Sequence, residues 1–386
     1  MQVKNGVNIV RKKADDFSKK LVTLVLPITF QQFMLALVSA SDAVMLGALS
    51  QDALSAVSLA SQITFVENLF LAAMTIGLSI FAAQYWGKND RISMEMIFAY
   101  VMKITAVVAF AFFLISLLMP AFLMQLFTNE KSLIDGGAVY LKAASLSFIL
   151  TGISQIYLCI LKNSGKAVKA GIVSAVSVVV NIFLNAVLIF GLFGIPKLEI
   201  AGAALATVAA RMIETIWCIL ESAQKDSIHL DLRYILHGSK PFKKDFWKYT
   251  FPVLGNEIVW GVGFTMYSVI MGHLGTDAVA ANSVANIIKN LIVCFCIGIG
   301  NGGGIIVGNE LGAGRLETVK KYGGKLCRLA VFFGIISGVV MFIISPIILK
   351  FSNLSNTATG YLKFMIVMCL LLHGSRRCLR RLQQEC

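Results

Sequence analysis

The sequence is poor in charge and in proline. Only 14% of its 386 residues are charged and only 6 are proline, whereas 57% are apolar and the mean hydropathy is +0.79. In soluble domains about a quarter of the residues are charged, so this composition excludes a soluble protein with an ordinary core. Disorder and a barrel of alternating strands also fit it poorly. We therefore predict an all-α polytopic membrane protein.

Motifs of soluble enzymes are also missing. The 8 Cys form no CxxC pair, the 4 His are scattered, and no HExxH or GxSxG occurs. Metal binding, redox chemistry and intramembrane hydrolysis are therefore not indicated. The segment KNSGKA lacks the first Gly and the final Ser or Thr of a phosphate loop, which argues against ATP-driven transport. We predict that the chain is not an enzyme and holds no cofactor and no metal.

Long apolar runs predict ten transmembrane spans. A hydrocarbon core of about 30 Å is crossed by about 20 helical residues. Runs of sufficient length lie at 21–46, 54–84, 97–126, 138–160, 168–192, 200–221, 249–270, 279–308, 327–349 and 359–373. The first run is too long for a cleaved signal peptide, so we count it as a span.

The basic residues follow a one-sided pattern. A net charge of +14 in a soluble protein would indicate nucleic-acid binding, but 26 of the 34 Lys and Arg fall in alternate connecting segments. These segments are 1–20, 85–96, 161–169, 222–248, 309–328 and 374–386. The positive-inside rule accounts for this asymmetry without nucleic acid. It predicts a multi-pass protein of the plasma (inner) membrane with a cytoplasmic N-terminus.

The sequence also repeats itself. At one constant offset Pro27 aligns with Pro252 and Asp52 with Asp277, and GALSQDALSAVSLA aligns with GHLGTDAVAANSVA without a gap. Such self-similarity indicates a duplicated fold. Each repeat begins on the same side and holds an even number of spans. We therefore predict two parallel six-span lobes related by an axis along the membrane normal.

This repeat predicts the domain boundaries. A cytoplasmic basic N-terminus (1–20) precedes the first six-helix lobe (21–221), a cytoplasmic inter-lobe loop (222–248) and the second lobe (249–373). The second lobe is incomplete by two spans, and an atypical basic tail (374–386) replaces the apolar pattern. A truncation explains this departure, and the alternative is a natural ten-span protein with a basic tail.

Ionisable side chains within spans are costly and therefore candidates for function. The acidic members of this set are Asp42, Glu67, Glu214 and Glu257. Arg211 precedes Glu214 by three residues and is expected to pair with it on one helical face. Lys289 is expected to neutralise Glu257. A ladder of glycines at 300, 304, 308 and 312 predicts close helix packing.

Asp42 has no basic residue within a helical turn or two and lies in the outer part of the first span. Asn181 and Asn185 share one face of the fifth span at a similar depth, so a carboxylate and two amides can meet. Such a group can bind H+, or Na+ through oxygen ligands. The alternative for Asp42 is a hydrated interfacial residue. Pro27 removes a backbone hydrogen bond from the same span and predicts a hinge there.

Four segments in this order resemble the multidrug and toxic compound extrusion (MATE) family of cation-coupled antiporters. They are LPITFQQFMLALVSASDAVMLG, SGKAVKAGIVSAVSVVVNIFLNAVLIFG, IAGAALAT and FPVLGNEIVWGVGFTMYSVIMGHLGTDAVAANSVANI. The resemblance extends to about residue 370. It implies twelve spans in two lobes and the export of toxic organic cations in exchange for H+ or Na+.

Single residues also match the family pattern. The resemblance places Asp42 and Asn181 in the first-lobe cation site and Pro27 where the first span bends. Asn185 stands where several members have aspartate, so the site has one carboxylate fewer. Glu257 lies in the seventh span, where some members use an acidic residue.

The working hypothesis is an antiporter, coupled to H+ or Na+, that exports amphipathic or cationic drugs across the inner membrane. Its partners are small organic cations and the lipid bilayer, without nucleic acid or ATP. One alternative is a flippase for lipid-linked precursors, which is expected to have several basic residues in its cavity. The candidates within spans are only Lys103, Lys142, Arg211, Lys289 and Lys363. Another alternative is an inactive truncated remnant that inserts but moves nothing.

Overall fold

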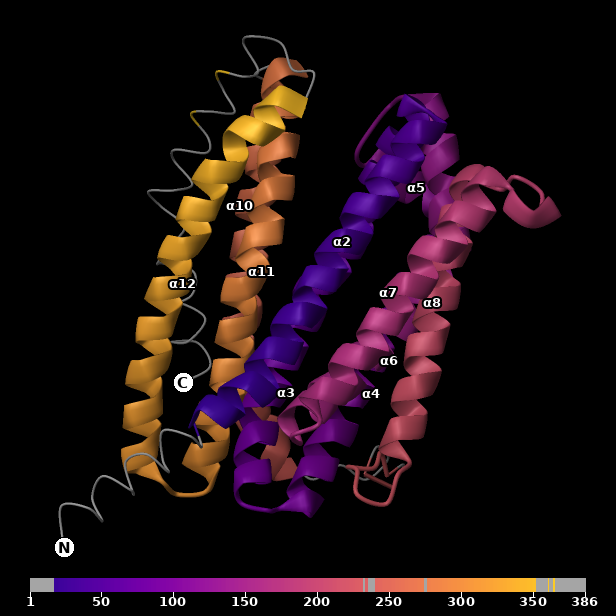
Figure 1. The fold of residues 1–386 in the computed structure, drawn as a ribbon. Helices are drawn as coiled ribbons and strands as arrows, with labels where there is room; N and C mark the ends of the chain where they lie inside the picture. The colour runs from indigo at the N-terminus through magenta and orange to yellow at the C-terminus, as the bar shows by residue number, and fades with distance from the viewer. Residues whose placement is uncertain are drawn as a thin grey trace, which may run out of the picture. The chain divides into compact units, whose positions relative to one another are not determined.

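The computed structural model describes residues 17–231, 233–234, 240–273, 276–351, 360 and 364. Every regular element among these residues is a helix (Figure 1). The predicted basic N-terminus up to residue 16 and the tail 374–386 lie outside the described residues. The tenth predicted span, 359–373, also lies outside them apart from Gly360 and Phe364.

Each of the first nine predicted spans coincides with a helix over most of its length. The elements are η1 (Leu21–Val25), α2 (Leu26–Leu49), α3 (Gln51–Gly87), α4 (Arg91–Leu118), α5 (Pro120–Gln125), α6 (Lys131–Asn163), α7 (Ala167–Phe190), α8 (Glu199–Ser222), α10 (Lys240–His273), α11 (Thr276–Gly312) and α12 (Leu316–Phe351). Among the described residues, 6 helices are long and apolar enough to cross a membrane. The structure therefore supports an all-α membrane protein.

The prediction of one span over 97–126 is wrong in its second part. The helix α4 ends at Leu118, and the short helix α5 begins at Pro120. Met119, between them, has a non-helical φ of -130° and ψ of 44°. A proline disfavours the helical conformation of the residue before it and is well suited to a first helical position. The apolar run continues across this break, so hydropathy did not reveal it.

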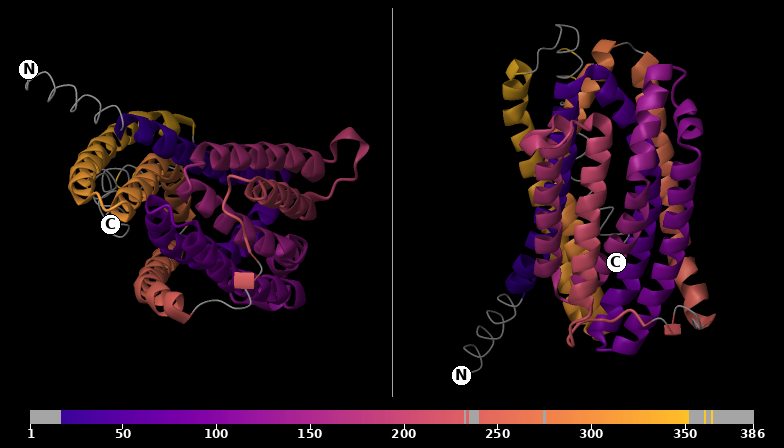
Figure 2. Two further views of the ribbon diagram at one scale, coloured as in Figure 1. Left: turned by 90° about the horizontal axis from the view of Figure 1, so that it is seen from below. Right: turned by 90° about the vertical axis from the view of Figure 1, so that its right-hand side faces the viewer.

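Local capping groups fix the ends of several helices. The Asp90 carboxylate accepts hydrogen bonds from the backbone N–H of Ser93 at 3.0 Å and from its hydroxyl at 2.6 Å, which starts α4. Gly191 ends α7 in the left-handed conformation, with φ of 73°. The short helix η2 (Leu192–Gly194) follows, and α8 then returns alongside α7 (Figure 2).

The contacts divide the chain into two compact units. One unit comprises Met34–Ala82 and Asp90–Gly261, and it holds α4 to α8 with parts of α2, α3 and α10. The other comprises Ala83–Asn89 and the described parts of 1–33 and 262–386, and it holds η1, α11 and α12. The lobe boundaries inferred from the repeat stay a prediction.

The interior of the larger unit is built around α6, which packs against α4 and α8 (Figure 1). An apolar cluster joins α3 to α5 and α6, and its buried members are Ala60, Ile63, Leu123, Met124, Leu141 and Phe148. The helices α7 and α8 approach closely at Gly202, where a Cβ would lie 2.6 Å from the Leu188 carbonyl oxygen. This close approach holds the polar faces of α7 and α8 against each other.

The smaller unit depends on small residues of α11. A Cβ at Gly312 would collide with the Gln84 carbonyl oxygen, and one at Gly308 would lie 2.7 Å from the Ala83 Cβ atom. A Cβ at Gly302 would lie 2.8 Å from the Val25 side chain. The predicted role of the glycine ladder in close packing is therefore confirmed at Gly308 and Gly312.

Candidate functional site

A chain of polar side chains links α2, α7 and α8. The Asn185 amide donates a hydrogen bond to the Asp42 carboxylate at 2.6 Å and another to the Asn181 side-chain oxygen at 3.1 Å. The Asn181 amide in turn donates to the Thr207 hydroxyl at 3.4 Å. The structure thus places together Asp42, Asn181 and Asn185, the three residues that the sequence assigned to a cation site.

The helices explain why these side chains meet. Asn181 and Asn185 lie four residues apart on the face of α7 that packs against α8, and both are buried. On the same face Ser177 donates a hydrogen bond to the Ala210 carbonyl at 3.0 Å. Asp42 is only half-buried, one turn before the fully enclosed Leu46. The carboxylate therefore lies at the edge of a buried polar network.

Thr207 is a member of this network that sequence reasoning missed. Its hydroxyl accepts from Asn181 and donates to the Ala203 carbonyl at 3.1 Å, one turn earlier on α8. The only signal in the sequence was its position at the end of IAGAALAT. An uncharged threonine in an apolar helix commonly bonds to its own backbone, so its role depends on α8 packing against α7.

The network offers several oxygen atoms to a bound ion. They belong to the Asp42 carboxylate, the Asn181 and Asn185 amides and the Thr207 hydroxyl. The Asn185 side-chain oxygen is buried and has no hydrogen-bond partner among the described residues. Chemically, the group can take a proton on Asp42 or surround a small hard cation with oxygen.

A second set of ionisable groups lies deeper in the same unit. Arg211 pairs with Glu214 at 2.8 Å, as their spacing predicts. The Arg211 guanidinium also attracts Asp42 and Glu67 electrostatically. Glu67 and Glu214 are almost fully buried, and Asp42 is half-buried. Arg211 therefore forms its ion pair with Glu214 and attracts the other two carboxylates without an ion pair among the described residues.

Pro27 and Glu257 lie apart from this network in the sequence. Pro27 is the second residue of α2, two residues after the end of the π-helical turn η1 (Leu21–Val25), so an irregular stretch of helix lies close to the predicted hinge. Glu257 is half-buried on α10. One turn after it α10 approaches α3, because a Cβ at Gly261 would collide with the Leu69 side chain. The side chain of Lys289, its expected partner, lies outside the described residues.

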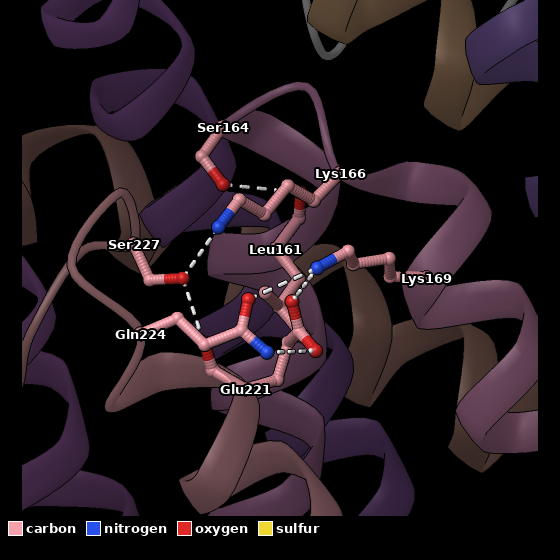
Figure 3. Close-up of polar contacts among 7 residues, drawn as sticks. All are labelled: Leu161, Ser164, Lys166, Lys169, Glu221, Gln224 and Ser227. Atoms are coloured by element: carbon pink, nitrogen blue, oxygen red, sulfur yellow. Dashed lines mark hydrogen bonds and ion pairs between the residues drawn. The ribbon is translucent and has the colours of Figure 1, made fainter.

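A different polar cluster joins the start of α7 to the end of α8 (Figure 3). Lys169 forms an ion pair with the buried Glu221 and donates to the Gln224 side-chain oxygen at 3.1 Å. The Gln224 amide donates to Glu221 at 3.0 Å, and Lys166 donates to the Ser227 hydroxyl at 2.5 Å. Each carboxylate oxygen of Glu221 thus has a donor, so this cluster fastens two helix ends.

The negative charge of the buried Glu310, in the smaller unit, is likewise balanced by cations. It accepts from Lys20 at 2.7 Å and from Arg315 at 2.5 Å. It lies beyond the span predicted over 279–308. Burial raises the pKa of Glu310, but the hydrogen bonds and charges of Arg315 and Lys20 outweigh burial and hold this pKa below its usual value of 4.5. Lys20 also lies 5.8 Å from the centre of the Tyr322 ring.

Comparison with known proteins identifies the fold and the family. A family model described as MatE matches residues 27–187 and 252–376. The chain belongs to the MATE family. The two matched segments begin at Pro27 and Pro252, the prolines that the internal repeat aligns. The protein is therefore a membrane transporter of the multidrug and toxic compound extrusion family and not an enzyme.

Individual relatives agree with the family assignment. The chain is 23% identical over 380 residues to a probable multidrug resistance protein NorM of Thermotoga maritima, covering 95% of this chain and 81% of the relative. It is 24% identical over 374 residues to the uncharacterized transporter YisQ of Bacillus subtilis, covering 95% and 80%. A solved structure of a MOP superfamily transporter from Pyrococcus furiosus matches with a TM-score of 0.84 at 16% identity, covering 96% of this chain and 82% of that one.

Proposed function

We propose that this MATE transporter is an antiporter that exports amphipathic or cationic organic compounds in exchange for H+ or Na+. The observation that carries the proposal is the hydrogen-bonded chain from Asp42 through Asn185 and Asn181 to Thr207. It combines one carboxylate at the edge of the protein interior with several neutral oxygen ligands. The probable multidrug resistance relatives support drugs as the exported class.

The coupling ion acts on Asp42. When a proton or Na+ binds, the carboxylate loses its net negative charge, and its hydrogen bond with Asn185 weakens because the acceptor is no longer fully anionic. Asp42 lies on the same helix as Pro27 and the π-helical turn Leu21–Val25, where the backbone hydrogen-bond pattern is already irregular. We therefore place the change of helix shape at that turn. Loss of the ion restores the charge and reverses the change.

Exchange follows if the ion and the drug stabilise different states of the transporter. A ligand shifts a conformational equilibrium only by its differential affinity for the two states. An ion bound at Asp42 favours one state, and an organic cation favours the state in which Asp42 is charged. The proposal includes the inner membrane as location and a cytoplasmic N-terminus, which follow from the distribution of Lys and Arg.

The test is ion-driven ethidium efflux from loaded cells that express the full chain. Asp42→Asn keeps the shape of the side chain but removes its charge, so efflux should be lost. Asp226→Asn is the matched control, because this carboxylate is exposed in the turn after α8 and should not affect export. Full efflux with Asp42→Asn, or no efflux by the membrane-inserted unmodified chain, would refute the proposal.

Measurements in proteoliposomes distinguish H+ from Na+ as the coupling ion. Ethidium export is measured with only a proton gradient and then with only a Na+ gradient across the membrane. The gradient that drives export in the unmodified protein and fails to do so in Asp42→Asn identifies the coupling ion. If neither gradient drives export, ion-coupled antiport is wrong for this chain.

A further inference from the structure

Glu67 lies in the middle of a buried apolar stripe on α3. The members of this stripe at helical spacing include Ala60 at 0%, Ile63 at 7%, Leu71 at 4% and Met74 at 0% exposure. Glu67 itself is 1% exposed. Ala60 and Ile63 pack in the apolar cluster with α5 and α6. A glutamate at this position places a carboxyl group where an apolar side chain would pack well.

The carboxyl group of Glu67 has few groups around it that could balance a negative charge. Its Oε1 atom is buried and has no hydrogen-bond partner among the described residues. Glu214, by comparison, is paired with Arg211 at 2.8 Å. A buried carboxylate without hydrogen bonds or a close cation is strongly unfavourable, and the protonated form avoids this cost.

The charged groups around Glu67 cannot compensate it. Arg211 on α8 attracts Glu67 and Asp42, but it is already paired with Glu214. No buried residue of α4, α5, α6 or α7, all of which lie in the described part of the chain, carries a charged side chain. On α10 the ionisable residue nearest to its contact with α3 is the half-buried Glu257, which supplies no positive charge. Ionisation of Asp42 and Glu67 together is therefore disfavoured.

We propose that Glu67 is a second proton-binding carboxylate of this transporter and exchanges its proton in the same cycle as Asp42. The proposal rests on the function proposed above and deepens it. Proton uptake converts the Glu67 carboxylate to the neutral acid, and release returns one proton and the carboxylate. A proton suits this position better than a metal ion, because a metal requires several oxygen ligands and the stripe around Glu67 is apolar.

Like charge couples the two carboxylates. Two ionised carboxylates in one unit repel each other, so loss of a proton from one favours retention of the proton on the other. An ion that neutralises Asp42 conversely removes this repulsion from an ionised Glu67. The two groups thus titrate as a coupled pair, and substrate binding at the Asp42 network changes proton binding at Glu67.

The first experiment reads protonation without transport. Infrared difference spectra between acidic and alkaline pH are recorded on the purified full chain, where protonated carboxyl groups give a separate C=O band. Glu67→Gln should remove one buried carboxyl component that Asp42→Asn retains. Glu221→Gln is the control, because this buried carboxylate is paired with Lys169 and not with Arg211, and it should retain that component.

A conservative variant keeps the test decisive. If Glu67→Gln does not fold, Glu67→Asp preserves a carboxyl group on a shorter side chain and should displace the same band instead of removing it. A spectrum of folded Glu67→Gln or Glu67→Asp that is identical to that of the unmodified protein would overturn the proposal.

The second experiment counts protons. Saturating ethidium is added to the purified protein in weakly buffered solution, and the proton release is recorded with a pH indicator. Glu67→Gln should raise the number of protons released per ethidium bound, because Glu67 no longer takes up part of the proton that Asp42 releases. An unchanged count refutes participation of Glu67. If the infrared component belongs to Glu67 but Asp42→Asn exports ethidium normally, the proposed function fails and the proton site stands. If Asp42→Asn loses export and Glu67→Gln changes neither signal, only the second proton site fails.

Discussion

Two kinds of buried or half-buried carboxylate occur among the described residues, and they differ in how their negative charge is balanced. Glu221 and Glu310 lie near helix ends, and each accepts from at least one cation and one further donor. Asp42 accepts from a single neutral amide, and the Glu67 Oε1 atom has no partner among the described residues. We expect the carboxylates that accept from cations to be structural and the other two to take part in transport.

The difference has a direct physical consequence. Hydrogen bonds from cations stabilise the charged form of a carboxylate, and such a pair contributes to the stability of the fold. A buried carboxylate with one neutral donor or none lies closer to the balance between its two protonation states. Such a group can bind and release an ion during transport, at some cost in stability. The following changes test this division, from the largest expected effect to the smallest.

Asn185→Leu should have the largest effect on ion affinity, because it removes the hydrogen bond to Asp42. A hydrogen bond to a charged group is worth about 1.5–3 kcal/mol and favours the ion-free carboxylate, so the apparent affinity of Asp42 for a coupling proton should rise by at least about tenfold. The measurement is the ion dependence of ethidium export in proteoliposomes. Asn163→Leu is the control: it removes another buried asparagine of the same unit, hydrogen-bonded to Cys159, and should leave ion affinity unchanged. Equal effects of the two variants would contradict the role of Asn185.

Glu221→Gln should act on stability and not on transport. The amide loses the charge that pairs with Lys169, whose side chain is 46% exposed, so part of the attraction is already screened by solvent. We expect a loss of about 1–2 kcal/mol in the free energy of unfolding. Thermal melting of the purified protein measures this change, and ethidium export below the melting temperature should keep the ion dependence of the unmodified protein. A changed ion dependence would place Glu221 among the working carboxylates.

Glu310→Gln should change the response of stability to acid. Because the folded pKa of Glu310 is below its usual value of 4.5, ionised Glu310 stabilises the fold above pH 4.5, and this contribution is lost as the pH falls through the folded pKa. The melting temperature of the unmodified protein should therefore fall on acidification below 4.5, and that of Glu310→Gln should fall less. Glu317→Gln, at an exposed position of α12, should retain the full decrease.

Asp42→Asn should have the smallest effect on stability although it abolishes export. An asparagine oxygen can still accept the hydrogen bond from Asn185, and the cost of holding a charge at a half-buried position disappears. We expect the free energy of unfolding to change by less than about 1 kcal/mol. A large drop in melting temperature would instead assign Asp42 to the compensated, structural group.

The sequence predicted most of the fold because the bilayer imposes a simple length requirement. Nine of the predicted spans coincide with helices, whose lengths follow from the thickness of the hydrocarbon core. The prediction missed the break before Pro120, since apolar residues continue on both sides of it. The predicted spans are also shorter than the helices where polar residues extend a helix beyond its apolar run. The helix α10, for example, begins before the predicted span.

The candidate site could be predicted in part. Asp42, Asn181 and Asn185 were found because a charged residue in a span is costly and the two asparagines share a helical face. Thr207 was not found, since it carries no charge and its role depends on which face of α8 meets α7. Arg211 was assigned only to Glu214, its neighbour on the same helix. Its attraction for Asp42 and Glu67 required the packing of three helices.

The sequence by itself determined the all-helical membrane class, the internal repeat and the helix on which each ionisable residue lies. These features depend on composition, on the length of apolar runs and on contacts within three or four residues along one helix. Only the tertiary structure decided which carboxylates have donors that balance their negative charge. These donors lie far away in the chain, such as Lys169 for Glu221 and Asn185 for Asp42. Helix packing, which no local pattern encodes, brings those donors within hydrogen-bonding distance.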